Sequence, residues 1–533
     1  MVTTMHRPPG TLVAILLTVS ALLAALPAFA QQPTPPWPTR GWAVSSPEEQ
    51  GMSSERLGRL VEFGAFNDMD SVLVTRHGRI VLEATYAPFQ AGLKHIAYSS
   101  TKAVVSTLVG MAVGDGLLAG TDARMVDFFP GRTIANLDDA KKSITVRQLL
   151  DMSSGLGWNE GLTDTFESVM AMVRSADWTQ YVLDQPMATP AGARFYYSSG
   201  TSHLLSAIVS KVTGKSALDY ARERLFGPLG IDDVQWWDDP QGVTMGGFGL
   251  SLQPRDMAKI GYLWLRGGQW EGKQILPAAW IEAVRQADVE MHERWSGDLR
   301  YARQFWVLPK RDAFMAVGRN RQLIVVMPKL DIVAVMTGSS RFTGPSGMVS
   351  TPRYGFDTLA GYLAAAAVSD GAIAADPAAA AALAEQVKAV AVEKPAPASP
   401  TAPSAIQKAV SGKTWRFAPG NPLRLARMTL TLDGPLPSFE YEADTSQPLT
   451  MPGKFGGPIG FDGRFAVGGR LPSGPSAARG TWSDDGASLM IEVQTLGNDD
   501  ARRVTFVFGD RKVEMSVHGV DGFRAKAEGQ AED

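Results

Sequence analysis

Two residues that could form a nucleophile and its base occur three positions apart, in the stretch Ser99-Ser100-Thr101-Lys102. If a helix starts at Ser99, positions i and i+3 share one face, so the lysine amine lies beside the serine hydroxyl. A lysine shielded from water there has a lowered pKa and can accept the serine proton. The helix N-terminus would add N–H groups and a positive field for an oxyanion. The alternative is an N-cap serine followed by a surface lysine.

A tyrosine that could assist this pair occurs further along the chain, within Phe195–Gly200. The segment precedes a predicted helix at Ser202–Val212. The phenol of Tyr197 could act as a general base or proton shuttle above the serine and lysine. The alternative is a tyrosine that only packs.

A third segment, Ala316-Val317-Gly318, lies at the end of a predicted strand, just before the strand Gln322–Met327. An edge strand in this position could line the substrate. The alternative is a plain strand end followed by a glycine turn.

The composition excludes several other chemistries. The 533 residues include no Cys, so there are no disulfides, no thiolate nucleophile and no Cys-based metal site. The six His do not form a local metal-binding pair, no cofactor or metal is implied, and we expect His95 and His203 to be structural. The net charge of −3 gives no general attraction for nucleic acid. No Gly-x-Ser-x-Gly elbow and no phosphate-binding Gly-x-x-x-x-Gly-Lys-[Ser/Thr] loop occur.

The N-terminus has the pattern of a signal peptide. His6-Arg7 precedes an apolar run from Leu12 to Ala25, and the small-x-small site Ala28-Phe29-Ala30 follows. The alternative is a retained membrane anchor, because about 20 apolar residues can span a bilayer. We expect cleavage, no stable membrane span afterwards, and a periplasmic or secreted protein.

The elements that would position the candidate residues follow from periodicity. Ser53–Phe66 predicts a helix, and Ser71–Tyr86 predicts a hairpin that turns at His77-Gly78. Residues 100–290 have mostly helical patterns. Later elements are predicted as strands at Ala302–Leu308, Ala313–Val317, Gln322–Met327 and Ile332–Thr337, and a helix near Tyr354–Ala367. Strands at both ends of a helical middle predict one antiparallel sheet in which the two ends of an α+β domain meet.

Composition shifts divide the chain into five segments. They are a signal peptide at 1–30, a Pro-rich leader at 31–44, the α+β domain at 45–370, an Ala/Pro-rich linker at 371–408 that is partly helical near Pro377–Val392, and a small β-sheet domain at 409–533. In the last segment, eight short alternating runs separated by Gly, Asp and Pro predict a barrel or a sandwich.

Six collinear segments resemble the serine β-lactamase and penicillin-binding superfamily, in its class C-related branch. Within this branch, the sequence is similar to 6-aminohexanoate-oligomer hydrolases and related esterases. The segments are Ser99–Lys102, Ile144–Glu160, Phe195–Gly200, Trp237–Gly242, Asp256–Gly261, and Ala316–Gly318 with Gln322. The resemblance covers roughly residues 45–368. It implies a β-lactamase-like fold, with an antiparallel sheet flanked by helices plus an all-helical subdomain.

The resemblance also implies roles for individual residues. It carries the family's nucleophile to Ser99 and its proton-transfer pair to Lys102 and Tyr197. The remaining candidates for oxyanion or substrate binding are Ser199, Ala316, Gly318, Arg319, Trp158 and Glu160, with the N–H groups of Ser99 and Arg319 as oxyanion donors. For Trp158 and Glu160 the alternatives are an aromatic that packs its loop and a capping or solvated carboxylate.

Two departures from the family pattern bear on the substrate. The family's Tyr-x-Asn reads Tyr197-Ser198-Ser199, so a short hydroxyl replaces an amide that would contact a substrate carbonyl. The Lys-Thr-Gly or His-x-Gly of penicillin binders reads Ala316-Val317-Gly318, so the cation for a β-lactam carboxylate is missing. Arg319 or Arg321 could replace it, or both could be solvated turn residues. Both departures favour an amidase or esterase.

We therefore expect an exported serine hydrolase that cleaves an ester or amide of a small molecule through an acyl-enzyme on Ser99. Three alternatives stay open. One is a β-lactamase or D,D-peptidase on the same fold, and another is a non-catalytic binding or sensor protein. The third is a docking protein that acts through the β domain, with incidental hydrolysis.

Overall fold

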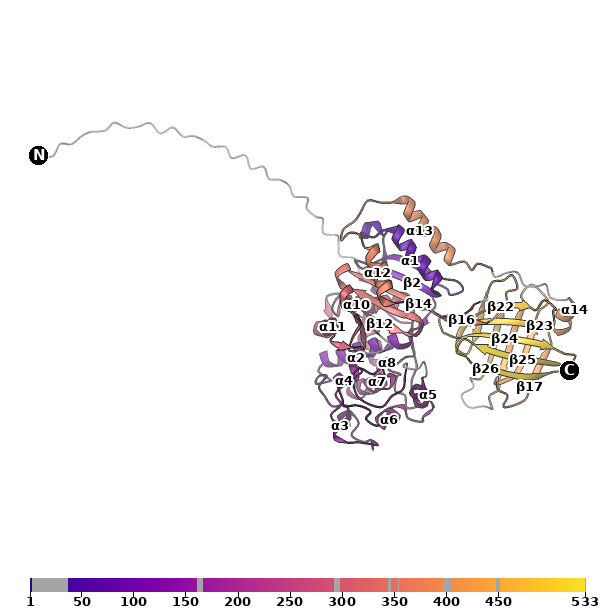
Figure 1. Ribbon diagram of the computed structural model, residues 1–533, viewed down its shortest axis with the longest axis horizontal. Coiled ribbons are helices and arrows are strands. Elements are labelled where there is room, and N and C mark those ends of the chain that lie inside the picture. Colours follow the sequence, from indigo (N-terminus) through magenta and orange to yellow (C-terminus); the bar gives the residue numbers. More distant parts are fainter. Residues whose placement is uncertain are drawn as a thin grey trace. The chain divides into compact units, whose positions relative to one another are not determined.

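Strands from both ends of the α+β domain share one sheet in the computed structural model, which describes residue 1 and residues 37–160, 166–291, 298–343, 347–352, 354–395, 404–446 and 451–532 (Figure 1). From edge to edge the strands are β1 (Ala43–Val44), β3 (Arg79–Thr85), β2 (Met69–Arg76), β14 (Ile332–Gly338), β13 (Gln322–Met327), β12 (Ala313–Gly318), β11 (Phe305–Leu308), β10 (Arg300–Ala302) and β9 (Val289–Glu290). Strands β2 and β14 pair antiparallel, which confirms the predicted meeting of the two ends. Strand β1 is the exception, because it joins the edge parallel to β3.

Alternate residues of the sheet enter two separate cores, one on each face. On β14, Val333 and Val335 belong to one core, and Ala334 and Met336 belong to the other. The first core includes helices α2 (Thr101–Gly114), α10 (Pro254–Leu265) and α11 (Ala278–Arg285), and the second includes α1 (Ser54–Phe66) and α12 (Phe356–Ala366). The sheet is therefore a middle layer that is buried on both faces.

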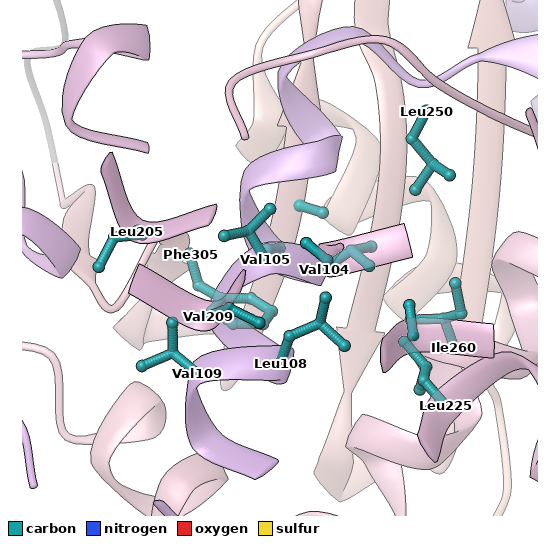
Figure 2. Close-up of a cluster of buried hydrophobic side chains, with 14 of the residues drawn as sticks. Val104, Val105, Leu108, Val109, Leu205, Val209, Leu225, Leu250, Ile260 and Phe305 are labelled. Atoms are coloured by element: carbon teal, nitrogen blue, oxygen red, sulfur yellow. The ribbon is translucent and has the colours of Figure 1, made fainter. Parts of the chain in front are cut away.

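Helix α2 is buried on all sides, and every residue from Thr101 to Ala112 is shielded from solvent. It packs against Leu205 and Val209 of α7 (Ser199–Thr213) and against Phe305 of β11 (Figure 2). A helix that is apolar all round is typical of a core position. The N-terminal end of α2, where Ser99 lies, is thus attached to the most deeply packed helix of the domain.

The predicted helical middle is confirmed, as a series of mostly short helices among the described residues. Besides α2, α7, α10 and α11, they are α3 (Asp139–Lys142), α4 (Val146–Leu150), α5 (Glu167–Arg174), α6 (Trp178–Leu183), α8 (Ala217–Ala221) and α9 (Gly227–Leu229). Three short strands from the same part of the chain form a small separate sheet, in the order β4 (His95–Ile96), β6 (Leu250–Leu252) and β5 (Gln235–Trp236). Strand β4 fixes the backbone just before Ser99 by pairing with β6.

One predicted strand, Ala302–Leu308, was correct only in its second half, which forms β11 (Phe305–Leu308). The expected strand Ala302–Leu308 is a hairpin of β10 and β11, and its turn residues Arg303 and Gln304 have φ of 50° and 70°. The side-chain amide of Gln304 donates to the carbonyls of Leu149 and Leu150, at 3.1 and 2.9 Å. The apolar run did not reveal the turn, because its left-handed residues are neither Gly nor Asn and are supported by a long-range contact.

The predicted all-β domain is confirmed, and it is a barrel. Within residues 404–446 and 451–532 a short helix, α14 (Ser404–Val410), precedes ten strands that close through the pairing of β17 with β26. The strands are β17 (Thr414–Phe417), β18 (Leu425–Thr431), β19 (Ser438–Ala443), β20 (Lys454–Pro458), β21 (Ala466–Leu471), β22 (Gly474–Trp482), β23 (Ser488–Thr495), β24 (Ala501–Phe508), β25 (Lys512–Gly519) and β26 (Arg524–Ala531). The sequence did not predict β20 and β26, because the first is rich in Gly and the second in Ala, Lys and Glu, which are depleted in strands.

The segment predicted as a partly helical linker contains α13 (Pro377–Val390), which packs on α1 and places Leu383 in the second core. Residues 36–533 form one compact unit. Residues 2–30 of the predicted signal peptide and residues 31–36 of the Pro-rich leader lie outside the described residues. Within the described ranges, no helix combines the length and the apolar character needed to cross a bilayer.

Candidate active site

Ser99 lies at the N-terminal end of α2, in a 3-10 turn formed by Tyr98–Ser100 that runs directly into the helix. Ser99 is half-buried. The preceding residue, Tyr98, has a φ of 44°, which is uncommon for an aromatic residue. The end of the helix dipole beside Ser99 favours negative charge, which suits a nucleophile that generates an oxyanion.

Lys102 lies one helical turn after Ser99, on the same face. Its Nζ donates a hydrogen bond to Ser99 Oγ at 2.9 Å, so the predicted contact between positions i and i+3 is present. The lysine is only 1% exposed. Burial lowers the pKa of Lys102 to about 8, although the negative charge of Glu160 opposes this shift. An amine with this pKa is partly neutral near physiological pH and can accept a proton from Ser99.

Two further acceptors surround the lysine amine. Nζ of Lys102 donates to Ser199 Oγ and to the backbone carbonyl of Gly247, each at 2.9 Å. The hydroxyl of Ser199 donates its single hydrogen to Glu160 Oε1 at 2.6 Å, so only its lone pairs face Lys102. A neutral amine has two hydrogens and one lone pair. In the neutral amine, both hydrogens go to Ser199 and Gly247, which act only as acceptors. The contact with Ser99 is then reversed, so that the serine hydroxyl donates to the lone pair of Nζ.

Glu160 and Trp158 lie behind this arrangement, and both are buried. Glu160 Oε2 accepts hydrogen bonds from the backbone N–H of Ser199 at 2.6 Å and from Trp158 Nε1 at 2.7 Å. The tryptophan ring also fills the space beside Gly200, where a Cβ would lie 2.7 Å from the ring. The structure therefore connects these two residues to Lys102 through Ser199.

Tyr197 completes the group. Its ring centroid lies 4.7 Å from Nζ of Lys102, and its hydroxyl shares a hydrogen bond with Ser99. Burial and the negative charge of Glu160 raise the pKa of Tyr197, while the bond with Ser99 lowers it. The phenol is therefore neutral at ordinary pH, and it can relay a proton between Ser99 and a leaving group.

The strand β12 was expected to be an edge strand, but it lies inside the sheet between β13 and β11. Its last residues end against the segment that precedes Ser99. A Cβ added to Gly318 would lie 2.3 Å from the carbonyl oxygen of Ala97, so only glycine allows this approach. The side chain of Ala316 is fully buried in the first core, so only the backbone of this residue could face a substrate.

The two arginines after Gly318, Arg319 and Arg321, have different neighbours. Arg319 is half-exposed and forms an ion pair with Asp499 at 3.5 Å. Arg321 stacks on the rings of Phe356 and Tyr354, with the guanidinium carbon 4.6 and 5.5 Å from the centroids, and burial lowers its pKa. Arg321 is therefore neither a solvated turn residue nor a substitute cation at Ser99.

His95 and His203 are held by buried carboxylates. His95 Nε2 lies 2.9 Å from Asp70 Oδ2, and His203 Nε2 lies 3.1 Å from Asp239 Oδ2. Both imidazoles are fully buried, in agreement with the structural role expected for them. The described residues contain no group of three or more His, Cys, Asp or Glu side chains placed to bind a metal ion.

Three residues of this region were not predicted from the sequence. Gly247 contributes the carbonyl that accepts from Lys102, and the Gly246-Gly247-Phe248-Gly249 run was the only signal for it. Asn498 and Asp499 come from the barrel and contact Tyr98 and Arg319. The sequence gives no signal for them beyond a polar turn, because their position depends on how the barrel docks.

The fold and this group of side chains define the class of protein. Residues 66–358 match the family model described as Beta-lactamase, which is more than half of the chain. The chain therefore belongs to the beta-lactamase family, and it is an enzyme of the β-lactamase-related serine hydrolase type.

Individual relatives of the chain have different names. The chain is 26% identical over 290 residues to 6-aminohexanoate-dimer hydrolase from Paenarthrobacter ureafaciens, covering 51% of this chain and 72% of that protein. It is 32% identical over 158 residues to penicillin-binding protein 4 from Amycolatopsis lactamdurans, covering 30% of this chain and 38% of that protein. A solved structure of a putative 6-aminohexanoate-dimer hydrolase from Bacillus anthracis matches with a TM-score of 0.49 and 19% identity, over 61% of this chain and 85% of that chain.

Proposed function

We propose that this protein hydrolyses esters or amides of small molecules through an acyl-enzyme on Ser99. The observation that carries the proposal is the hydrogen bond of 2.9 Å between Nζ of the buried Lys102 and Ser99 Oγ. A lysine whose pKa is about 8 removes the serine proton without a histidine or a metal. The similarity to a protein named 6-aminohexanoate-dimer hydrolase supports an amide or related bond as the target.

In the proposed reaction, Ser99 Oγ attacks the substrate carbonyl carbon and its proton passes to neutral Lys102. The N–H groups of Ser99 and Arg319 stabilise the tetrahedral oxyanion. When the bond to the leaving amine or alcohol breaks, Tyr197 relays a proton to that group. Water then attacks the acyl-enzyme, gives its proton to the same pair, and releases the acid while Ser99 regains its hydrogen.

The second candidate is cleavage of a β-lactam or a D-alanyl peptide, which the similarity to a penicillin-binding protein favours. The charges around the site argue against it. A carboxylate-bearing substrate needs a cation beside the end of β12, but Ala316 is apolar and Arg319 is paired with Asp499. We therefore propose neutral ester or amide substrates as the principal ones. The apolar run followed by Ala28-Phe29-Ala30 supports our further proposal that the enzyme is exported.

The test is hydrolysis of a neutral p-nitrophenyl acyl ester by the wild-type enzyme and by Ser99→Ala. We expect turnover by the wild type and none by the variant. Ser202→Ala is the matched control, because its hydroxyl is bonded to Gln304 Oε1 at 2.6 Å, away from Lys102. Undiminished hydrolysis by Ser99→Ala would refute the proposal. Turnover of nitrocefin with a higher kcat/KM than any neutral ester would favour the second candidate.

A further inference from the structure

A turn of the barrel reaches the segment that carries the nucleophile. This barrel turn, Leu496–Asp500, connects β23 and β24. The backbone N–H of Ile96 donates to the carbonyl of Gly497 at 2.9 Å. Gly497 has a φ of 78°, and a Cβ there would lie 2.1 Å from the carbonyl oxygen of Lys94. Only glycine allows the two backbones to approach this closely.

The base of the barrel turn is anchored by apolar contacts. Leu496 packs with Phe89 and Ala477 in a small buried cluster, with Leu93 and Phe465 at its margin. Phe89 and Leu93 precede the catalytic segment, whereas the other members belong to the barrel region. This cluster fixes where the polar end of the barrel turn lies.

The polar end of the barrel turn binds the side chain next to the nucleophile. The hydroxyl of Tyr98 donates to Asn498 Oδ1 at 3.0 Å and accepts from the backbone N–H of Asp499 at 3.2 Å. Burial raises the pKa of Tyr98, so its hydroxyl keeps the hydrogen that it donates. Tyr98 has a left-handed φ of 44° that a non-glycine residue rarely adopts without support. The barrel turn supplies that support at the residue directly before Ser99.

The barrel turn also contacts Ser340 and Arg319, through Asp499. The side chain of Asp499 is 1% exposed, and its Oδ1 accepts from the backbone N–H of Ser340 at 2.7 Å. Its other oxygen pairs with Arg319 at 3.5 Å. Arg319 follows Gly318, which touches the carbonyl of Ala97. Adjacent residues of one turn thus contact both segments from which the proposed oxyanion donors come.

We infer that the barrel is part of the catalytic apparatus, with Asn498 and Asp499 as positioning residues for the N–H groups of Ser99 and Arg319. This inference rests on the proposed function. Oxyanion donors act on the tetrahedral state more than on bound substrate, so their displacement lowers kcat and leaves KM nearly unchanged. A misplacement of about 1 Å can slow a reaction by about 10²-fold, so we expect a smaller displacement to slow it about tenfold.

The experiment measures kcat and KM of the full-length protein on a neutral p-nitrophenyl ester, together with the inhibition constant of phenylboronic acid, which forms a tetrahedral adduct with an active-site serine. The variants are Asn498→Ala, Tyr98→Phe and the double variant. We expect kcat to fall about tenfold in Asn498→Ala, with KM unchanged and the inhibition constant raised in parallel. Because both substitutions remove one shared hydrogen bond, we expect the double variant to be no slower than Tyr98→Phe.

The control is Glu393→Gln, which alters a different contact with the barrel. Glu393 Oε2 accepts from the backbone N–H of Phe465 at 2.7 Å, and the carboxylate pairs with Arg479. We expect it to keep the wild-type kcat. Wild-type kcat and boronate affinity in Asn498→Ala, a change confined to KM, or additive losses in the double variant would each overturn the inference. Absence of Ser99-dependent turnover in the wild type would instead overturn the proposed function and this inference with it.

Discussion

Ser199 separates Lys102 from Glu160: its hydroxyl accepts from Nζ of the lysine at 2.9 Å and donates to the carboxylate at 2.6 Å. The carboxylate therefore influences the lysine without touching it. Direct contact would form a tight ion pair and hold the lysine in its charged form. The intervening hydroxyl leaves the pKa of Lys102 low enough for the amine to act as a base.

The pH dependence of kcat/KM of the wild-type enzyme should depend on the pKa of Lys102. Activity requires neutral Lys102, so kcat/KM for a neutral ester should rise with pH and level off above an apparent pKa of about 8. The measurement is a kcat/KM profile from about pH 6 to about pH 10 with a substrate that does not titrate in this range. An acid limb near the ordinary pKa of lysine would show that burial does not act on Lys102 as we describe.

Glu160→Gln removes the negative charge behind Ser199. That charge favours the protonated form of Lys102, so its loss should lower the pKa of the lysine and move the acid limb of the profile to lower pH. Glu167→Gln is the matched control, because its exposed carboxylate bonds to Asn159 at the end of the same loop. A shift of the acid limb to higher pH in Glu160→Gln would contradict this assignment.

Gly318→Ala should disturb the nucleophile without changing any charged group. The added Cβ would lie 2.3 Å from the carbonyl of Ala97, so the strand end or the segment before Ser99 has to move. We expect a loss of about 10²-fold in kcat/KM for the ester. Gly371→Ala serves as the control, because a Cβ there meets nothing within 4 Å. Equal activity in the two variants would show that this close approach has no catalytic importance.

Asp70→Asn tests stability. Burial alone would raise the pKa of Asp70, but the hydrogen bond from His95 and the charge of Arg341, 2.6 Å away, lower it to about 2. Because the folded pKa lies below the ordinary value of 3.8, this stabilisation is complete above about pH 4 and is lost as the pH falls towards 2.

We expect Asp70→Asn to lower the free energy of unfolding at pH 7 by at least about 2 kcal/mol, with a smaller difference from the wild type near pH 3. Urea denaturation at both pH values measures this. An exposed carboxylate, Asp357→Asn, is the control, since it pairs with Arg311 at the surface. A difference that does not change between the two pH values would contradict the assignment to Asp70.

Local sequence patterns were sufficient to predict much of the fold. The hairpin at His77-Gly78 was predictable because both residues adopt the left-handed conformation that such a turn demands, with φ of 49° and 73°. The strand β26 was not predictable, because its Ala-, Lys- and Glu-rich sequence becomes a strand only by pairing with β25 and β17. The break between β10 and β11 likewise depends on a tertiary contact, from Gln304 to α4.

In the candidate site, too, some contacts could be predicted from the sequence and others could not. The contact between Ser99 and Lys102 was predictable because helix geometry alone brings positions i and i+3 together. The place of Glu160 behind Ser199 was not, since it depends on how two loops far apart in the sequence pack. Burial of Lys102, which sets its pKa, is also a property of the whole core around α2 and not of the motif.

The bond between Tyr98 and Asn498 joins residues 400 positions apart, which has a consequence for the order of events during synthesis. A chain leaves the ribosome N-terminus first, and its domains usually fold as units in that order. The sheet can close once β14 has emerged, because β14 pairs with β2. A nascent chain at that stage already contains Ser99, Lys102 and Tyr197, but Tyr98 lacks both of its hydrogen-bond partners. The nucleophile segment acquires its final contacts only after the translation of Asp499.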